Sequence, residues 1–293
     1  MARTNNSSLI PHPSSFQLPR GRKLLIPHPP AVMGILNVTP DSFSDGGVHF
    51  DHAKAVHGAL QMAADGAVVV DIGGESTRPG AEPIAAQVEI DRVVPVIEQI
   101  RQRSDIPISI DTRKGAVAEE ALAAGADMIN DISALRYSAA MPAIVARAKV
   151  PVILMHMRGE PGTMQKNIHY DEVVSEVGSE LTGFRDAAIA AGVDPAQILV
   201  DPGIGFSKTF EHNLEILARA AELATIAPLV IGASRKAFIG HLTGGEAGPD
   251  RMVGSLATVA AAHRAGATLV RVHDVRQTVD FLKVLTAIAE REK

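Results

Sequence analysis

The chain has 293 residues, of which 46% are hydrophobic and 21% charged, so it is long and apolar enough to bury a full core. Aromatic residues make up only 3%, Trp is absent, and 28 basic residues are dispersed among 33 acidic ones, which disfavours carbohydrate-stacking and nucleic-acid-binding surfaces. Because Cys is absent, disulfides, thiolate metal sites and cysteine nucleophiles are excluded.

The first 30 residues differ in composition from the rest. They contain six Pro, and no acidic residue precedes Asp41. We predict an irregular, partly disordered arm over residues 1–30, with solvated basic side chains. No secretory signal is expected there, and no run in the chain approaches the roughly 18 apolar residues of a membrane helix. A cytoplasmic protein that binds neither membrane nor nucleic acid is therefore expected.

From residue 31 to 293 the chain repeats one pattern, a short aliphatic run followed by a segment of helical period. The predicted strands are 32–36, 67–72, 106–110, 127–130, 150–155, 197–201, 228–232 and 267–272. The predicted helices are 52–65, 86–102, 114–124, 138–148, 170–191, 210–223, 250–264 and 276–290. This alternation favours a single-domain α/β fold, a (β/α)8 TIM barrel. A doubly wound open sheet is the alternative, but the glycine fingerprint expected after its first strand is absent.

Polar residues follow every predicted strand, where the chemistry of such a barrel resides. Those that we single out are Asn37, Thr77, Arg78, Asp111, Asn130, Asp201, Ser234, Lys236, Arg271 and His273. Carboxylates, amides and cations would converge on one rim, which predicts a ligand with hydrogen-bond donors in one part and an anionic group in another. The sequence has no HExxH zinc motif and no GxxxxGK[ST] nucleotide loop.

The loops carry a family resemblance. Residues 33–47 read MGILNVTPDSFSDGG and residues 71–80 read DIGGESTRPG, and both segments resemble the signatures of the dihydropteroate synthase family. Shorter matches are Asp111-Thr112, Asn130-Asp131-Ile132, Met155-His156-Met157, Asp201-Pro202-Gly203-Ile204-Gly205-Phe206, Ser234-Arg235-Lys236 and Arg271-Val272-His273-Asp274. The resemblance spans about residues 31–290 with the segments in order, so only the N-terminal arm falls outside it.

The resemblance implies condensation of 6-hydroxymethyl-7,8-dihydropterin diphosphate with 4-aminobenzoate to give 7,8-dihydropteroate and pyrophosphate. It assigns Asp201 to the donor-rich edge of the pterin. Asn130 and Asp111 would complete the pterin pocket, and Lys236 would hydrogen-bond the ring.

The same resemblance places the diphosphate near Asn37, Arg271 and His273, with Mg²⁺ touching Asn37. Such a magnesium ion is usually held largely by the substrate, with one or two protein oxygens added.

Thr77 and Arg78 would belong to a mobile loop that closes over the diphosphate. The aminobenzoate would lie beside this loop, Pro79, Phe206 and Ser234.

The resemblance also implies a dissociative reaction. Pyrophosphate leaves with two electrons from the pterin methylene, and the ring delocalises the positive charge, so catalysis is mostly positioning and electrostatics. Asp111 is then a candidate for stabilising the cation, and Lys236, Thr77 and Arg78 complete the predicted catalytic set. No side-chain nucleophile is needed.

Structural explanations compete with several of these assignments. Taken alone, Asp201-Pro202-Gly203 is a common turn. Asp71, Glu75 and Asp131 are as well explained by hydrogen bonds to loop backbone as by contact with substrate. His156 is explained equally well as a hydrogen-bonded structural histidine at the top of the barrel and as a catalytic group.

One position departs from the family pattern. A hydroxyl residue commonly follows the Ser-Arg-Lys segment, whereas Ala237 stands here. The departure concerns one hydrogen bond to the aminobenzoate carboxylate and leaves the pterin half intact.

Two alternative functions are weighed against the synthase. A pterin barrel that transfers the methyl group of methyltetrahydrofolate to a corrinoid protein would have no reason for the cations at the diphosphate end. A non-catalytic paralogue would have no reason for intact loops. Dimerisation through the later helices is expected by family analogy, with an apolar stripe of small residues over 250–264.

Overall fold

The computed structural model describes residues 13–27, 30–39, 52–78 and 80–291. Within them, eight parallel strands run in the order β8-β7-β6-β5-β4-β3-β10-β9. The strands are β3 (Ala31–Asn37), β4 (Val69–Gly73), β5 (Ile108–Asp111), β6 (Met128–Asp131), β7 (Val152–Met155), β8 (Ile198–Asp201), β9 (Val230–Ile231) and β10 (Leu269–Val272). A parallel bridge between Val200 and Leu229 brings the first and last strands together. The predicted (β/α)8 barrel is confirmed, and each predicted strand overlaps an observed one.

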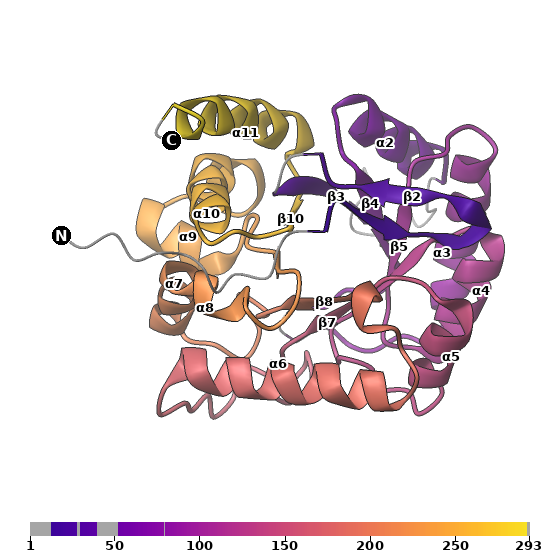
Figure 1. Ribbon diagram of the computed structural model, residues 1–293, viewed down its shortest axis with the longest axis horizontal. Coiled ribbons are helices and arrows are strands. Elements are labelled where there is room, and N and C mark those ends of the chain that lie inside the picture. Colours follow the sequence, from indigo (N-terminus) through magenta and orange to yellow (C-terminus); the bar gives the residue numbers. More distant parts are fainter. Residues whose placement is uncertain (1–12, 28–29, 40–51, 79, 292–293) are drawn as a thin grey trace.

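Helices surround the strands, as Figure 1 shows. They are α2 (His52–Ala64), α3 (Ala86–Arg101), α4 (Gly115–Ala124), α5 (Met141–Ala148), α6 (Val173–Ala190), α7 (Phe210–Ala218), α8 (Ala220–Leu223), α9 (Ala237–Thr243), α10 (Met252–Arg264) and α11 (Val275–Ala289). The predicted helix 210–223 is divided at Arg219, whose φ of −112° and ψ of 16° are not helical. The helix α9, directly after β9, was not predicted. Among the described helices, none is both long and apolar enough to cross a membrane.

Four glycines make the turns that return the chain from a helix to the next strand. Their φ values are positive, between +70° and +122°, at Gly66, Gly125, Gly192 and Gly266. A side chain is strained in this conformation, so glycine permits these short connections.

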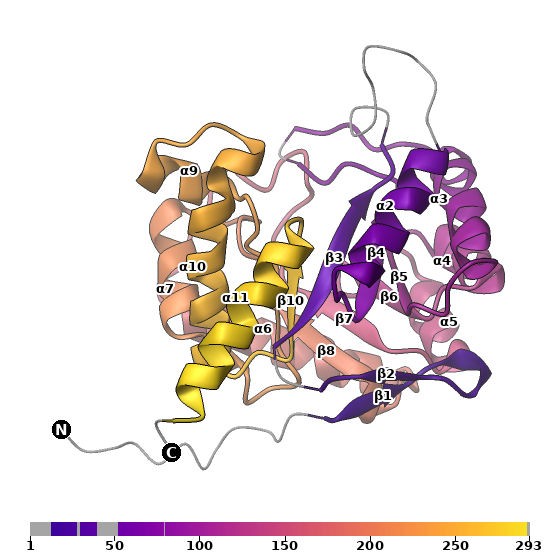
Figure 2. The same cartoon turned by 90° about the horizontal axis from the view of Figure 1, so that it is seen from above.

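The N-terminal arm is only partly irregular, which corrects the prediction. Residues 1–12 lie outside the described chain, but β1 (Ser15–Gln17) and β2 (Lys23–Leu25) form an antiparallel hairpin around the short 3₁₀ helix η1 (Pro19–Gly21). The hairpin lies across the end of the barrel where the strands begin (Figure 2). Phe16 and Leu24 are buried there against inward side chains such as Met33 and Leu199. Burial of this apolar face orders the segment despite its prolines.

The sequence predicts solvated basic side chains in this segment. The structure instead holds two of them in ion pairs. Arg20 and Arg22 both donate to the buried carboxylate of Asp127, and Arg101 of α3 does so at 2.7 Å. Asp127 also accepts the backbone N–H of Ile108 at 3.0 Å. These ion pairs fasten the hairpin to the closed end of the barrel and leave the opposite end for a ligand.

Candidate active site

The inward face of the barrel changes from apolar to polar along the strands. Its lower layer is an apolar cluster that includes Val69, Met128, Leu199 and Leu269 together with the hairpin. Successive side chains of a strand alternate between its two faces, so the next inward residue lies two positions further on. Those residues are Asp71, Asn130, Asp201 and Arg271. Three of the predicted substrate residues, Asn130, Asp201 and Arg271, therefore lie inside the upper half of the barrel.

A continuous hydrogen-bonded network joins three of these inward side chains, those of Asp71, Asn130 and Arg271, to Asp111. The Oδ2 atom of Asp71 accepts from Nε of Arg271 at 2.6 Å and from Nδ2 of Asn130 at 3.0 Å. Nη2 of Arg271 donates to Oδ2 of Asp111 at 2.6 Å. The barrel thus brings together residues from β10, β4, β6 and β5, as expected from their positions at strand ends.

Burial and charge oppose each other in this network. Burial raises the pKa of Asp111 above its usual value, an effect that Arg271 opposes and Asp71 reinforces. Burial alone would lower the pKa of Arg271, but Asp71 and Asp111 raise it above its ordinary value. Arg271 therefore stays cationic, and it is the counter-charge on which both carboxylates depend.

Asp201 ends β8, and Lys236 directly precedes α9. Oδ1 of Asp201 accepts the backbone N–H of Gly203 at 2.7 Å, and burial raises the pKa of this carboxyl. The Lys236 ammonium lies 4.2 Å from the centroid of the Phe206 ring, and burial lowers its pKa to about 8, with Arg271 acting in the same direction. The cation over the ring face is a favourable cation–π arrangement. A carboxylate, a cation and an aromatic wall thus adjoin one another here.

Ser234 and His273 are partners. The Ser234 hydroxyl lies 3.1 Å from Nδ1 of His273 and accepts the backbone N–H of His273 at 3.2 Å. Burial lowers the pKa of His273 to about 3, with Arg235 and Arg271 adding to the effect. The imidazole is neutral at pH 7, so it offers a hydrogen bond and no charge. The Arg235 guanidinium pairs with Asp274, at 3.0 Å and 2.5 Å, and is thus held in a structural ion pair.

The remaining predicted residues lie on the rim. Asn37 ends β3, half-buried, in register with Gly73. Thr77 is half-exposed and Arg78 is exposed, on the loop after β4. The predicted first loop, residues 40–51, and Pro79 lie outside the described residues.

The base of the loop after β4 is anchored by a buried ion-pair cluster. Glu75 accepts from the Lys114 ammonium at 2.8 Å and from the backbone N–H of Ile84 at 2.9 Å. Lys114 also donates to Glu89 at 2.6 Å. These contacts support the structural interpretation of Glu75 over direct contact with a substrate.

A second buried network, which the sequence did not indicate, supports the Phe206 loop. Lys208 donates to the carbonyl of Phe206 and lies against Nδ1 of His156, both at 3.0 Å. The other ring nitrogen of His156 lies 3.1 Å from Glu180. Burial lowers the pKa of His156 to about 4, with Lys208 adding to the effect, which supports the structural explanation of this histidine. A lone lysine after a turn carries no sequence signal that would have revealed this contact.

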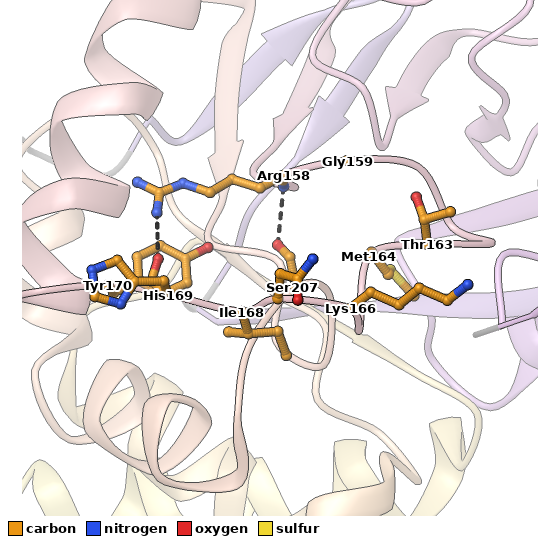
Figure 3. A pocket seen from close by; sticks show the side chains of 10 residues that line it. Arg158, Gly159, Thr163, Met164, Lys166, Ile168, His169, Tyr170 and Ser207 are labelled. Atoms are coloured by element: carbon orange, nitrogen blue, oxygen red, sulfur yellow. Dashed lines mark hydrogen bonds between the residues drawn. The ribbon is translucent and has the colours of Figure 1, made fainter.

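A hollow of about 520 Å³ lies beside this network, and Figure 3 shows it from close by. Arg158, Tyr170 and Ser207 line it, and Arg158 extends over the Tyr170 ring, 4.0 Å from its centroid. None of the predicted substrate residues lines the hollow, so it is distinct from the polar interior of the barrel.

Comparisons with known proteins agree with the geometry. The sequence model of a family described as "Pterin binding enzyme" matches residues 33–273. Dihydropteroate synthase of Escherichia coli (strain K12) is 46% identical over 270 residues, covering 92% of this chain and 94% of that protein. The structure of Xanthomonas albilineans dihydropteroate synthase with 4-aminobenzoic acid has a TM-score of 0.86 and 47% identity, covering 92% of this chain and 96% of that one. The structure of the Xanthomonas albilineans enzyme in complex with 7,8-dihydropteroate has a TM-score of 0.82 and 44% identity, and the match covers 92% of this chain and 97% of that one.

Proposed function

Because this chain belongs to the dihydropteroate synthase family, we propose that it condenses 6-hydroxymethyl-7,8-dihydropterin diphosphate with 4-aminobenzoate. The products are 7,8-dihydropteroate and pyrophosphate, so the enzyme is a transferase. The observation that carries the proposal is the gathering of buried acceptors and a cation inside the barrel, from strands that carry the motifs resembling the family.

The pterin half of the substrate would occupy the wall formed by Asp201, Asn130 and Lys236. The pterin edge is an amide fused to an aminopyrimidine, and its N–H groups need acceptors. Asp201 supplies a carboxylate that is 6% exposed. Lys236 would donate to the ring acceptors, and Phe206 would close the site where the two substrates meet.

The diphosphate would lie at the rim, where Arg271 supplies the charge and His273 a neutral hydrogen bond. Asn37 points to the same end of the barrel from the neighbouring strand β3, because β10 and β3 pair in parallel. A bidentate guanidinium is well suited to phosphate oxygens.

Magnesium fits this rim only with the substrate's help. Within the described residues, no three His, Asp or Glu side chains group as metal ligands, whereas Asn37 offers one amide oxygen of the hard type that magnesium prefers. Asn37 would therefore hold the ion together with diphosphate oxygens. When bound, magnesium would neutralise charge on the departing pyrophosphate.

The chain's own contribution to the reaction would be positioning and electrostatics. Asp111 would face the positive charge that grows on the pterin methylene as the C–O bond breaks. Thr77 and Arg78 would close over the diphosphate, and Ser234 would help to hold the aminobenzoate. The aryl amine then attacks the methylene carbon and loses a proton to water.

Two wider proposals accompany this function. We expect a homodimer through the later helices, because Val253 of α10 is 73% exposed and Leu242 of α9 is 58% exposed. A cytoplasmic location is part of the proposal, since both substrates are charged and cross lipid poorly.

Incubation of the purified protein with the pterin diphosphate, magnesium and aminobenzoate tests the function directly. We expect stoichiometric dihydropteroate and pyrophosphate. Tight pterin binding without product would instead indicate the non-catalytic paralogue, and methyl transfer from methyltetrahydrofolate to a corrinoid protein would indicate the other alternative.

A further inference from the structure

Asp71 is the buried centre of the site, although it is not among the predicted substrate contacts. The side chain is fully buried, and one oxygen, Oδ2, receives both Asn130 and Arg271. Within the described residues, the other oxygen has no hydrogen-bond partner. The carboxylate is thus directed at two groups that are proposed to touch the substrate.

The chemistry of this contact determines which way the Asn130 amide faces. A primary amide has an oxygen that only accepts and a nitrogen that only donates. The Asp71 carboxylate, paired with Arg271, only accepts. The amide nitrogen of Asn130 must therefore face Asp71, and the oxygen must face away.

The consequence is a fixed order of donor and acceptor. One N–H of Asn130 is used by Asp71, and the second lies on the same edge of the amide as the oxygen. Asn130 therefore offers a donor beside an acceptor in one order only. An amide in this orientation complements a ring nitrogen next to an amino group, as in other bidentate amide–base pairs.

We propose that Asp71 is a positioning residue that fixes the amide orientation of Asn130 and so selects the 2-amino-pyrimidine edge of the ligand. The inference rests on the proposed function, because it concerns the pterin half of that site. A ligand with the reverse order places its own N–H against the N–H of Asn130 and its carbonyl against the carbonyl of Asn130, so neither hydrogen bond can form. Without Asp71 the amide turns freely and no longer distinguishes the two orders.

A double-mutant cycle tests the proposal. The probe is 6-hydroxymethyl-7,8-dihydropterin, which lacks the diphosphate and therefore leaves the charge of Arg271 out of the measurement. We expect Asn130→Ala and Asp71→Ala each to weaken binding about tenfold, the scale of one good bidentate pair. The double variant should bind no more weakly than Asn130→Ala alone. Additive losses would overturn the proposal.

Asp71→Asn is the matched control, because its amide oxygen can still accept from both neighbours although the charge is gone. We expect its affinity for the uncharged probe to remain within about threefold of wild type, since only the acceptor is required. A loss as large as in Asp71→Ala would contradict this. Preference for the pterin over its 2-oxo analogue should fall in Asp71→Ala and persist in Asp71→Asn, which a purely structural role would not predict.

A measurement on the unaltered side chain covers the case in which Asp71→Ala does not fold. In the ¹⁵N-labelled wild-type protein, the side-chain amide signals of Asn130 are identified by their absence in Asn130→Ala, and the N–H that Asp71 accepts should exchange slowly with water. Fast exchange of both amide protons would refute a fixed orientation. Product formation by wild type is assayed separately, so a failed synthase assay would reject the proposed function without deciding the orientation of the amide.

Discussion

Replacing Asp201 with Asn tests whether the buried Asp-Pro-Gly turn is a binding group or only a turn. The variant keeps an oxygen for the Gly203 N–H, which lies 2.7 Å from Oδ1. It removes the negative charge and puts an amide donor where Oδ2 would face the pterin. The local turn should therefore survive while the ligand contact is inverted.

The expected magnitude follows from these two losses. A hydrogen bond to a charged group contributes about 1.5–3 kcal/mol, and a donor left without a buried acceptor adds about 1–3 kcal/mol. A combined loss of about 3 kcal/mol weakens pterin binding about 150-fold. Stability should change in the opposite sense, because burial raises the pKa of Asp201 and a neutral amide relieves the cost of burying its charge.

The matched control is Asp194→Asn, in an exposed Asp-Pro-Ala turn in which the carboxylate also accepts the backbone N–H two residues further on. Oδ1 of Asp194 accepts the Ala196 N–H at 2.9 Å, two residues ahead, just as Asp201 accepts from Gly203. Calorimetric titration with 6-hydroxymethyl-7,8-dihydropterin should separate the two variants, with wild-type affinity in the control. Equal affinities in both would show that Asp201 is only a turn residue. A large loss of stability in Asp201→Asn would contradict the expected relief of buried charge.

Four further outcomes are expected. Burial lowers the pKa of Lys236 to about 8, so the ammonium loses its proton above that pH. The kcat/KM for the pterin diphosphate should therefore fall above about pH 8. Lys236→Arg should retain activity to higher pH. Asp127→Asn should lower the unfolding midpoint by about 5 °C without changing turnover at 25 °C, because it leaves three partly exposed guanidinium groups without their carboxylate partner. Ala237→Ser should modestly lower the KM for aminobenzoate and leave that for the pterin diphosphate unchanged, as initial rates will show. Chelation of magnesium should abolish turnover but spare binding of the diphosphate-free pterin, measured by titration.

The barrel could be predicted because its signals are local and repeated. Each strand is an aliphatic run, and glycines such as Gly125 and Gly266 mark the return from a helix to the next strand. The hairpin was missed because β1 and β2 have three residues each, too few for a period to appear. The division between α7 and α8 at Arg219 has neither Gly nor Pro to announce it.

The site was predictable to the level of strand ends and no further. The rule that chemistry lies at the carboxyl ends of barrel strands brought Asp111, Asn130 and Asp201 together correctly. It said nothing about which side chains pair, because Arg271 and Asp71 are 200 residues apart and meet only when the barrel closes. The roles of the individual site residues in the reaction stay predictions.

The shared guanidinium suggests why the same residues suit a dissociative reaction. Arg271 serves Asp71 and Asp111 in this structure, at 2.6 Å to each. In the proposed reaction the departing pyrophosphate competes for that guanidinium as negative charge builds on it. Asp111 then loses part of its counter-charge while positive charge grows on the adjacent pterin, so its attraction for the cation rises along the reaction path. An interaction that strengthens toward the transition state is what accelerates a chemical step.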